Sequence, residues 1–481
     1  MSVGELSSKS IIIAGFGIEG QSTYAYLRRR FPAHALAIAD RREFSQCEIS
    51  ADVRSMIERD PHVRLFFGPD YLDRACEYDL AIKSAGIPFD HPGIRAFEAA
   101  GGIVTSHLEI FFGVFDRNRI VGITGTKGKS TTATLLHHIG RNAGLDVRLA
   151  GNIGRPPLSL IEDAGGKTLF VLELSSYQLD RFSYSPHMAV LLNIVPEHIG
   201  LHEPSSEAAH HRNFEDYVSA KENITRGQGA GDILIFNPAH EIPREIGLRS
   251  RARALHFSAE GPVSHGCYVT GEGIFYSDGS KQHHVANLAD ISLLGKFNRE
   301  NVLAAITAAS LLKAPAAAIQ SALRTFKPLP HRIEFVGEHG GIRFYDDSIA
   351  TVAQATLNAL DGLGMDVQTL IAGGHDRNLK YEELAKEVAQ SGIKNLILFE
   401  PTGRQIWDAV LKALQAPAEA AAIKAFWPQS MEEAVRIAYK VTEPGKICLL
   451  SPASSSYGMF KNFVERGDVF KACVKELAGE R

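Results

Sequence analysis

The stretch Gly122-Ile123-Thr124-Gly125-Thr126-Lys127-Gly128-Lys129-Ser130-Thr131-Thr132 decides how the middle of this chain folds. The apolar run 120–123 predicts a buried strand before it, and apolar side chains at helical spacing in 133–143 predict a helix after it. A strand, a glycine-rich turn and a helix form a phosphate-binding geometry, because backbone N–H groups and the positive end of the helix dipole face the anion. We expect Lys129 to contact the outer phosphates of a nucleotide, and Ser130 or Thr131 to offer a hydroxyl to Mg²⁺.

The spacing of this loop differs from that of the common P-loop. The common pattern needs a glycine five residues before Gly128, where this chain has Ile123. A turn that merely joins a strand to a helix is the alternative, but the combination Gly-Lys-Ser-Thr after a buried strand favours nucleotide binding. The predicted ATP-binding loop consists of Gly125, Thr126, Lys127, Gly128, Lys129, Ser130 and Thr131.

Length and composition limit the class of protein. A chain of 481 residues is too long for one ordinary core and suggests about three domains. The formal net charge of -4 provides no bulk field for nucleic acid or an anionic membrane, and no apolar run reaches the roughly 20 residues that span a bilayer. The five cysteines are scattered without Cys-x-x-Cys spacing, which is typical of a reducing cytoplasm. We therefore expect a cytoplasmic protein without nucleic-acid partners or membrane insertion.

The N-terminal segment carries a second glycine-rich turn. The strand 10–14 leads into Gly15-Phe16-Gly17-Ile18-Glu19-Gly20, and the strand 35–39 ends at Asp40. This is the complete dinucleotide pattern, Gly-x-Gly-x-x-Gly with an acid about 20 residues later. The pattern requires only a diphosphate and a ribose, so both NAD and a UDP-sugar satisfy it. Further strands at 80–86 and 101–105 predict a Rossmann-like domain up to residue 107.

Polar residues follow successive strands of the central segment. The strand 168–172 ends at Glu173, and the strand 188–194 is followed by Glu197 and His198. Because ligands of open parallel sheets bind at the carboxyl ends of strands, Glu173 and His198 are candidate metal ligands. The alternative for each is a solvated or core residue. A helical pattern carries Tyr217-x-x-x-Lys221.

The C-terminal segment again alternates strands and helices after Pro328-Leu329-Pro330. The expected strands cover 341–345, 367–372, 395–399 and 447–450, and each ends in polar residues. The predicted fold is therefore α/β with mostly parallel sheets, in three domains at 1–107, 108–328 and 329–481.

Over nearly its whole length the chain resembles the Mur ligase family. Several motifs occur together and in order, and their joint chance occurrence is negligible. These are Gly-Thr-Lys-Gly-Lys-Ser-Thr, Gly-Asn-Ile-Gly, Glu-Leu-Ser-Ser-Tyr-Gln-Leu, Glu-His, Tyr-x-x-x-Lys, Gly-Lys-x-Asn-x-x-Asn, Pro-His-Arg, Asp-Ser-x-Ala-Thr, and Ser-Pro-x-x-x-Ser-x-x-x-Phe-Lys-Asn-Phe-x-x-Arg-Gly. The last motif favours the members that add glutamate.

The resemblance implies a Rossmann-like UDP-binding domain, a central ATPase domain and a C-terminal amino-acid domain. It implies an ATP-dependent ligase that joins glutamate to UDP-N-acetylmuramoyl-L-alanine through an acyl phosphate in peptidoglycan precursor synthesis. The implied cofactors are ATP and two Mg²⁺ ions, the partners are these small-molecule substrates, and the expected state is a monomer.

The family's functional residues fall on matching positions of this chain. The expected UDP-sugar site comprises Gly15, Gly17, Ile18, Glu19, Asp40, Arg41, Arg42 and Ser84. The further ATP contacts are Asn298, Arg332 and Asp347. The catalytic set is Lys129, Lys221, His198, Asn152 and His331. The metal ligands are Ser130, Glu173, His198 and Lys221 as a carbamate. The glutamate site comprises Thr351, Arg377, Ser456 and Phe463.

Two departures affect the expected glutamate site. Ile349 stands where the family usually has a lysine, and Arg377 replaces another glutamate-binding lysine. A related branch adds L-glutamate, so both enantiomers stay open, with D-glutamate expected. Three further hypotheses compete with this one: a tripeptide-adding or folate member of the family, an NAD-dependent oxidoreductase, and a non-catalytic nucleotide-binding module.

Overall fold

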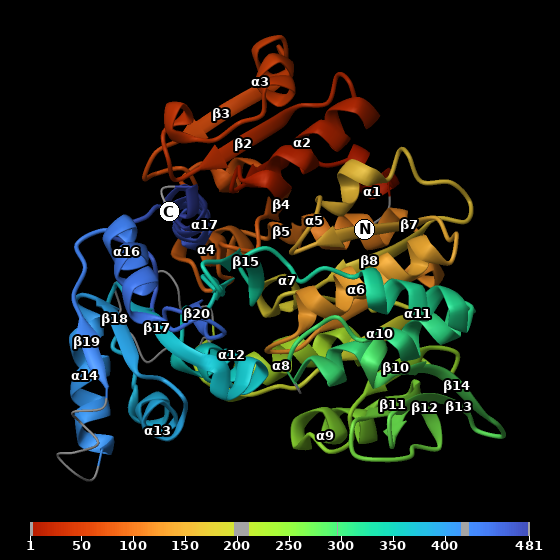
Figure 1. Cartoon of the computed structure of the whole chain (residues 1–481). Coiled ribbons are helices and arrows are strands. Elements are labelled where there is room, and N and C mark those ends of the chain that lie inside the picture. The colour runs from red at the N-terminus through yellow and green to blue at the C-terminus, as the bar shows by residue number, and fades with distance from the viewer. Residues whose placement is uncertain (1–2, 197–210, 296, 415–422, 480–481) are drawn as a thin grey trace. The chain divides into compact units, whose positions relative to one another are not determined.

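The computed structural model describes residues 3–196, 211–295, 297–414 and 423–479, which contain both helices and strands (Figure 1). Residue contacts divide the chain into two compact units. The first comprises Met1–Asp290 with Glu300–Thr325, and the second comprises Ile291–Arg299 with Phe326–Arg481. The first unit contains two sheets and the second contains one, which confirms the predicted α/β class. None of the described helices is long and apolar enough to cross a membrane.

The N-terminal sheet is entirely parallel, with the order β3-β2-β1-β4-β5. Its strands are β1 (Ile11–Ala14), β2 (Leu36–Asp40), β3 (Val63–Phe67), β4 (Leu80–Lys83) and β5 (Ile103–Ser106). The helices of this segment are α1 (Val3–Ser7), α2 (Ile18–Arg30), α3 (Ala51–Glu58), α4 (Pro92–Ala99) and α5 (His107–Val114). The chain runs from β1 outward to β3 and then returns to β4 on the other side of β1. The crevice expected for a ligand therefore lies beyond the carboxyl ends of β1 and β4.

The central sheet has nine strands among the described residues, in the order β14-β13-β12-β11-β10-β9-β6-β8-β7. They are β6 (Ile120–Thr124), β7 (Val147–Gly151), β8 (Leu169–Glu173), β9 (Met188–Leu191), β10 (Ile233–Phe236), β11 (Arg253–Ser258), β12 (His265–Thr270), β13 (Gly273–Asp278) and β14 (Gln282–Asn287). Only the β12–β13 and β13–β14 pairs are antiparallel. The helices are α6 (Lys129–Asn142), α7 (Ser176–Leu179), α8 (Phe214–Arg226), α9 (Glu241–Arg249), α10 (Phe297–Leu311) and α11 (Ala316–Thr325).

The sheet of the second unit has the order β15-β16-β20-β17-β18-β19, and only the β15–β16 pair is antiparallel. Its strands are β15 (Glu334–His339), β16 (Ile342–Asp346), β17 (Val367–Gly373), β18 (Asn395–Phe399), β19 (Lys424–Phe426) and β20 (Ile447–Leu450). The helices are α12 (Ala353–Leu363), α13 (Glu382–Gln390), α14 (Thr402–Ala413), α16 (Met431–Val441) and α17 (Phe463–Gly479).

Strand periodicity explains how this last sheet is buried. Along β17 and β18, Leu370 and Leu396 belong to one apolar cluster, whereas their neighbours Ile371 and Ile397 belong to another. Successive side chains of a strand point to opposite faces, so both faces of the sheet are covered. Such strands read as continuous apolar runs, and this pattern made them predictable from the sequence.

Candidate functional site

The phosphate loop joins β6 directly to α6. Gly125 and Gly128 have φ angles of 150° and 86°, which glycine adopts without strain. Gly128 is the N-cap residue of α6, so the helix begins at Lys129, four residues before the predicted start. The free backbone N–H groups of the first helical turn therefore follow the glycine turn immediately, as an anion site requires.

Asn301 of α10 closes one side of this loop and was not among the predicted site residues. A Cβ atom on Gly128 would lie 2.0 Å from Asn301 Oδ1, so only glycine fits at this position. Asn301 is buried, and its carbonyl accepts a hydrogen bond from Thr132 Oγ1 at 3.5 Å. The sequence signal was the second asparagine of the Gly-Lys-x-Asn-x-x-Asn motif, of which only Asn298 entered the predicted site.

Two lysine side chains converge on the carbonyl oxygen of Gly125. Lys129 Nζ donates to it at 3.0 Å and to Thr126 O at 2.8 Å, and Lys221 Nζ donates to it at 2.7 Å. Lys221 is 1% exposed, and its Nζ lies 4.6 Å from the centre of the Tyr217 ring. The structure thus brings the predicted pair Lys129 and Lys221 together at the loop.

Glu173 lies at the carboxyl end of β8, beside β6. Its Oε1 accepts a hydrogen bond from Asn152 Nδ2 at 3.0 Å. Its Oε2 is buried and has no hydrogen-bond partner among the described residues. A buried carboxylate oxygen without a donor is costly, and it is the arrangement expected of a cation ligand. The other predicted ligand, His198, lies outside the described residues.

The N-terminal glycine turn is closely packed. A Cβ on Gly15 would lie 2.2 Å from Ser84 Oγ, and one on Gly20 would lie 2.1 Å from Gly15 O. By contrast, a Cβ on Gly17 would meet nothing within 4 Å. Ile18, the first residue of α2, is 69% exposed. Gly15 and Ser84 therefore lie in close contact at the carboxyl ends of the paired strands β1 and β4.

Asp40 at the end of β2 is fully engaged by the protein. Its Oδ2 accepts from Phe16 N at 2.7 Å, and Arg42 binds both carboxylate oxygens, at 2.9 and 3.0 Å. Burial opposes ionisation, but the hydrogen bonds from Arg42 and Phe16 outweigh it and lower the pKa of Asp40. Glu19 is bound elsewhere, accepting from Gln178 Nε2 at 2.6 Å, and Arg41 is exposed.

In the second unit, two predicted ATP contacts, Arg332 and Asp347, and the predicted catalytic residue His331 precede β15 or follow β16. His331 Nδ1 lies 2.7 Å from Asp346 Oδ2, and Ser451 Oγ donates to Asp347 Oδ2 at 2.7 Å. Burial raises the pKa of Asp347 to about 7. Arg332 Nε is buried with no hydrogen-bond partner among the described residues.

A cluster of metal-ligating side chains beside these residues needs no ion. His331, Glu334 and Asp346 offer atoms within 4.8 Å of one another. However, Glu334 binds Lys471 at 3.2 Å, and Asp346 binds His331. Asn298, also in this unit, is buried, with its Nδ2 donating to Leu294 O at 2.6 Å.

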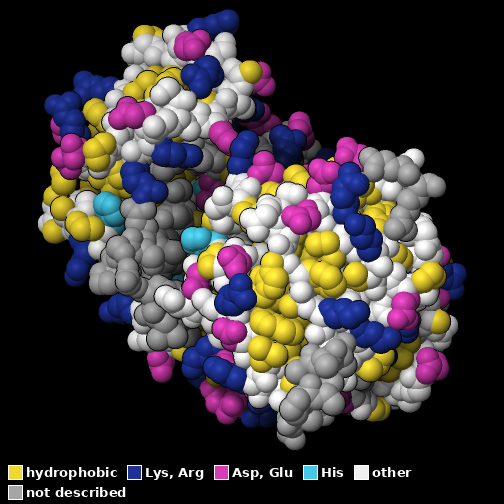
Figure 2. All heavy atoms as spheres, turned by 60° about the vertical axis from the view of Figure 1, so that its left-hand side comes forward, with side chains coloured by type: hydrophobic (Ala, Val, Ile, Leu, Met, Phe, Trp, Pro, Cys, Tyr) yellow, Lys and Arg dark blue, Asp and Glu magenta, His cyan; other side chains and the backbone are white. Residues whose placement is uncertain are grey.

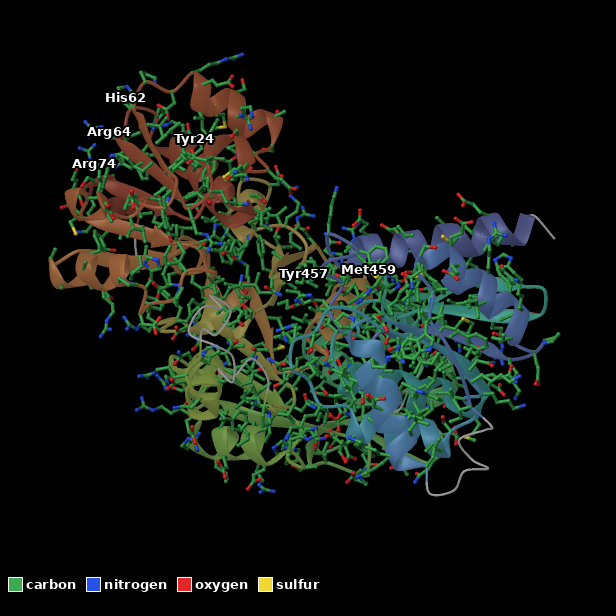
Figure 3. All side chains as sticks on the ribbon, turned by 90° about the vertical axis from the view of Figure 1, so that its left-hand side faces the viewer. Tyr24, His62, Arg64, Arg74, Tyr457 and Met459 are labelled. Atoms are coloured by element: carbon green, nitrogen blue, oxygen red, sulfur yellow. The ribbon has the colours of Figure 1, made fainter. Side chains whose placement is uncertain are left out.

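The predicted glutamate residues follow three neighbouring strands, β16, β20 and β17. Ser456 lines a cavity of about 200 Å³ at the carboxyl ends of β17 and β20. The Ser455 hydroxyl, in the wall of this cavity, is buried without a partner among the described residues. Arg377 is exposed, and the carbonyl of Phe463 accepts from Ser348 Oγ at 2.8 Å. Tyr457 and Met459, on the loop after β20, are 61% and 44% exposed (Figure 3).

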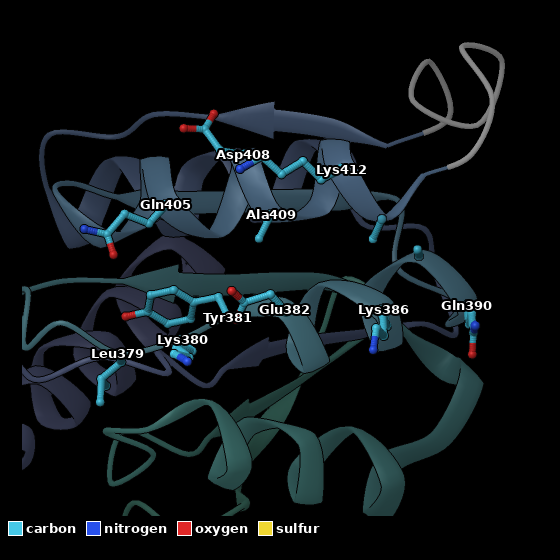
Figure 4. Close-up of a pocket in the computed structure, with 12 residues that line it drawn as sticks. Leu379, Lys380, Tyr381, Glu382, Lys386, Gln390, Gln405, Asp408, Ala409 and Lys412 are labelled. Carbon is cyan, nitrogen blue, oxygen red and sulfur yellow. The ribbon is translucent and has the colours of Figure 1, made fainter.

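One groove of the second unit lies apart from the predicted site residues. A groove of about 800 Å³ lies along α13 and α14 and is lined by Tyr381 and Glu382 on one side and by Gln405 and Ala409 on the other (Figure 4). No residue of the predicted sites lines it. On the face shown in Figure 2, the described basic and acidic side chains are interspersed. The candidate sites therefore remain those at the carboxyl ends of strands.

Comparison with known proteins agrees with this geometry. Residues 123–309 match the Mur ligase middle domain, and residues 331–454 match the Mur ligase glutamate ligase domain. The chain is 34% identical over 475 residues to the UDP-N-acetylmuramoylalanine--D-glutamate ligase of Acetivibrio thermocellus, covering 98% of this chain and 97% of that protein. The enzyme of the same name from Caldanaerobacter subterraneus is 34% identical over 476 residues, covering 98% and 99%.

Solved structures share the fold at low sequence identity. The UDP-N-acetylmuramate-alanine ligase of Thermotoga maritima superposes with a TM-score of 0.57 at 15% identity, covering 98% of this chain and 100% of that one. At this identity the likeness shows the fold alone.

Proposed function

The chain belongs to the Mur ligase family, and we propose that it joins D-glutamate to UDP-N-acetylmuramoyl-L-alanine at the expense of ATP. The relatives that carry this name match the chain along nearly its whole length. The observation that carries the proposal is the convergence of Lys129 and Lys221 on Gly125 O, after the strand β6 that pairs with Glu173 of β8; one Glu173 carboxylate oxygen is buried without a partner among the described residues. A cytoplasmic monomer is part of the same proposal.

The proposed reaction activates a carboxylate, which is by itself a poor acyl donor. The alanyl carboxylate oxygen attacks the γ-phosphorus of ATP, the bond to the β,γ-bridging oxygen breaks, and ADP leaves. The glutamate amine then attacks the acyl carbon, the acyl–oxygen bond breaks and phosphate leaves, with loss of the amine proton. Lys129 would neutralise charge on the transferred phosphoryl oxygens, which is the main electrostatic need of phosphoryl transfer.

The residues around the loop suit Mg²⁺, an ion that prefers oxygen ligands. Glu173 supplies a buried oxygen that has no donor in the part of the chain that the structure describes, and Ser130 supplies a hydroxyl at the start of α6. We propose that Lys221 becomes a carbamate: its neutral amine adds CO₂ and releases a proton, which turns a cation into an oxygen ligand. His198 would complete the ligand set for two ions. Bound Mg²⁺ would offset the negative charge of the phosphates.

The substrates are assigned to the other predicted residues. The UDP-sugar is proposed to bind at the crevice of Gly15, Gly17 and Ser84, with Ile18, Glu19, Asp40, Arg41 and Arg42 around it. Asn152 and His331 are proposed to lie near the reacting groups, and Asn298, Arg332 and Asp347 to bind ATP. The glutamate carboxylates are proposed to be bound by Thr351, Arg377, Ser456 and the backbone near Phe463.

The decisive experiment measures ADP release with UDP-N-acetylmuramoyl-L-alanine and each of D-glutamate, L-glutamate and meso-diaminopimelate. We expect turnover with D-glutamate. Turnover with L-glutamate alone would assign the chain to the L-glutamate-adding branch, and turnover with none would refute the ligase. Protection from thermal unfolding by NADH and not by the UDP-sugar would point to an oxidoreductase.

A further inference from the structure

Lys83, the last residue of β4, is a buried cation that the reaction above does not use. It is 3% exposed. Its Nζ donates to Ile87 O at 2.8 Å and to Ser84 O at 3.5 Å. Both carbonyls belong to the loop 84–89, so the ammonium group holds this loop from beneath.

The same loop is held a second time through its aromatic residue. Lys83 Nζ lies 4.2 Å from the centre of the Phe89 ring, and the guanidinium carbon of Arg181 lies 4.4 Å from it. Arg181, just after α7, is paired with Glu98 of α4 at 3.1 Å. A cation beside an aromatic face is attracted by the ring, and the attraction is stronger for a buried cation such as Lys83 than for the more exposed Arg181. Phe89 thus contacts one cation from β4 of the N-terminal segment and one from the segment after α7.

The loop held in this way packs against the N-terminal glycine turn, where the UDP-sugar is proposed to bind. Ser84 Oγ and the Ile87 side chain are the atoms that a Cβ on Gly15 would meet, at 2.2 and 3.4 Å. Ser84 N also donates to Ala14 O at 2.8 Å. A shift of the loop would therefore change the width of the crevice at Gly15.

Charged groups from several elements face the Lys83 ammonium in a cavity of about 330 Å³. Burial lowers the pKa of Lys83 to about 8, the neighbouring acids partly oppose this, and Arg181 adds to it. The charged groups that line the cavity with Lys83 are Glu19, Glu98, Glu109, Asp180 and Arg181.

We propose that Lys83 is a positioning residue for the UDP-sugar: its ammonium group, between the loop carbonyls and Phe89, holds the 84–89 loop at the width that the diphosphate and uridine need. This role rests on the proposed function, because it takes the crevice of Gly15 and Ser84 as the UDP-sugar site. Lys83 acts through the loop and touches no reacting atom. Its loss should therefore affect binding of one substrate and leave the chemical step nearly intact.

The test compares Lys83→Met with Lys167→Met, an exposed lysine of the same unit. Calorimetric titration with UDP-N-acetylmuramoyl-L-alanine should show about tenfold weaker binding for Lys83→Met, which corresponds to the loss of one charged hydrogen bond. Lys167→Met should bind this substrate as tightly as the wild type. ATP affinity and kcat should stay within about twofold, so that only KM for the UDP-sugar rises. Unchanged UDP-sugar affinity in folded Lys83→Met would overturn the proposal.

A pH series separates positioning by charge from mere packing. Since the pKa of Lys83 is about 8, raising the pH from about 7 to about 9 removes its charge and the attraction to Phe89. Wild-type affinity for the UDP-sugar should fall over this range, whereas Lys83→Met should not respond. Equal slopes would contradict the proposal.

Two further measurements keep the test decisive. If Lys83→Met does not fold, Phe89→Leu takes its place, and it should weaken UDP-sugar binding severalfold; unchanged binding would count against the role of the loop. If wild-type protein binds no UDP-sugar, the proposed function itself fails, and this outcome is distinct from a Lys83 variant that matches wild type.

Discussion

The two glycine turns of the first unit, after β1 and after β6, both join a strand to a helix but differ in their electrostatics. Both follow a buried parallel strand and lead into a helix. At the N-terminal turn, Asp40 is already bound by Phe16 N and Arg42. At the phosphate loop, two lysines share Gly125 O, and one oxygen of Glu173 has no partner among the described residues.

This difference indicates what each turn can bind. An unpaired buried carboxylate oxygen costs about 1–3 kcal/mol, and a ligand that pairs with it recovers this free energy. Glu173 beside the phosphate loop can therefore still accept a cation, whereas the carboxylate of Asp40 at the N-terminal turn is already bound by Phe16 N and Arg42. We expect charge substitutions to act mainly at the phosphate loop, and changes of side-chain volume to act mainly at the N-terminal turn.

The largest effect is expected from Lys129→Ala. Losing the cation that would face the phosphoryl oxygens should lower kcat about a thousandfold. UDP-sugar affinity should survive, because the N-terminal turn does not use this charge. Steady-state kinetics and calorimetric titration measure the two quantities, with exposed Lys281→Ala as the control. Equal losses of turnover and UDP-sugar affinity would mean that the two turns do not act as separate sites.

Lys221→Ala should rank second, with a loss of about a hundredfold, because a metal ligand and its charge are removed. A short carboxylic acid such as acetate should partly restore activity, since it replaces the missing carbamate oxygens. The matched control is Lys129→Ala, which acetate should not rescue. Full activity of Lys221→Ala without acetate would show that the reaction does not need the carbamate. Independently, mass spectrometry of the native protein should detect the added CO₂ on Lys221.

The second unit has a glycine turn of its own, Gly373-Gly374 at the end of β17, and the comparison of the turns can be extended to it. Arg377 follows it and is exposed. Losing one charged hydrogen bond of about 1.5–3 kcal/mol should raise the KM for glutamate roughly ten- to a hundredfold in Arg377→Ala, and leave the KM for ATP unchanged. Arg377→Lys, which keeps the charge, is the control. A glutamate KM within about twofold of wild type would show that another group binds the carboxylate.

Much of the fold was predictable because it depends on local patterns. The apolar runs at 367–372, 395–399 and 447–450 became β17, β18 and β20 with bounds within one residue. The glycine turns and the polar residues after each strand were predictable for the same reason. Which residues of the site contact substrates stays a prediction.

What the sequence did not reveal depends on contacts between distant segments. Asn301 packs against Gly128, and Arg181, which follows α7, lies against the ring of Phe89 in the N-terminal segment. The burial of the Ser455 hydroxyl likewise depends on how the end of β20 packs against β17. No spacing rule along the chain encodes such contacts, since they follow from the packing of whole layers.

The smallest effect is expected from Gly17→Ala in the N-terminal turn. This variant is informative because it should change ligand binding without changing the stability of the fold. Gly17 has a negative φ and open space around its Cβ position, so Gly17→Ala should change the free energy of unfolding by less than about 0.5 kcal/mol. Gly20→Ala would place a Cβ 2.1 Å from Gly15 O and should lower the Tm clearly. If the N-terminal turn binds a diphosphate through its shape, the open space at Gly17 is where the ligand approaches the backbone. Gly17→Ala should then weaken UDP-sugar binding a few fold at an unchanged Tm, with ATP affinity unaffected. Unaltered UDP-sugar affinity in this stable variant would mean that the diphosphate does not approach the turn at Gly17.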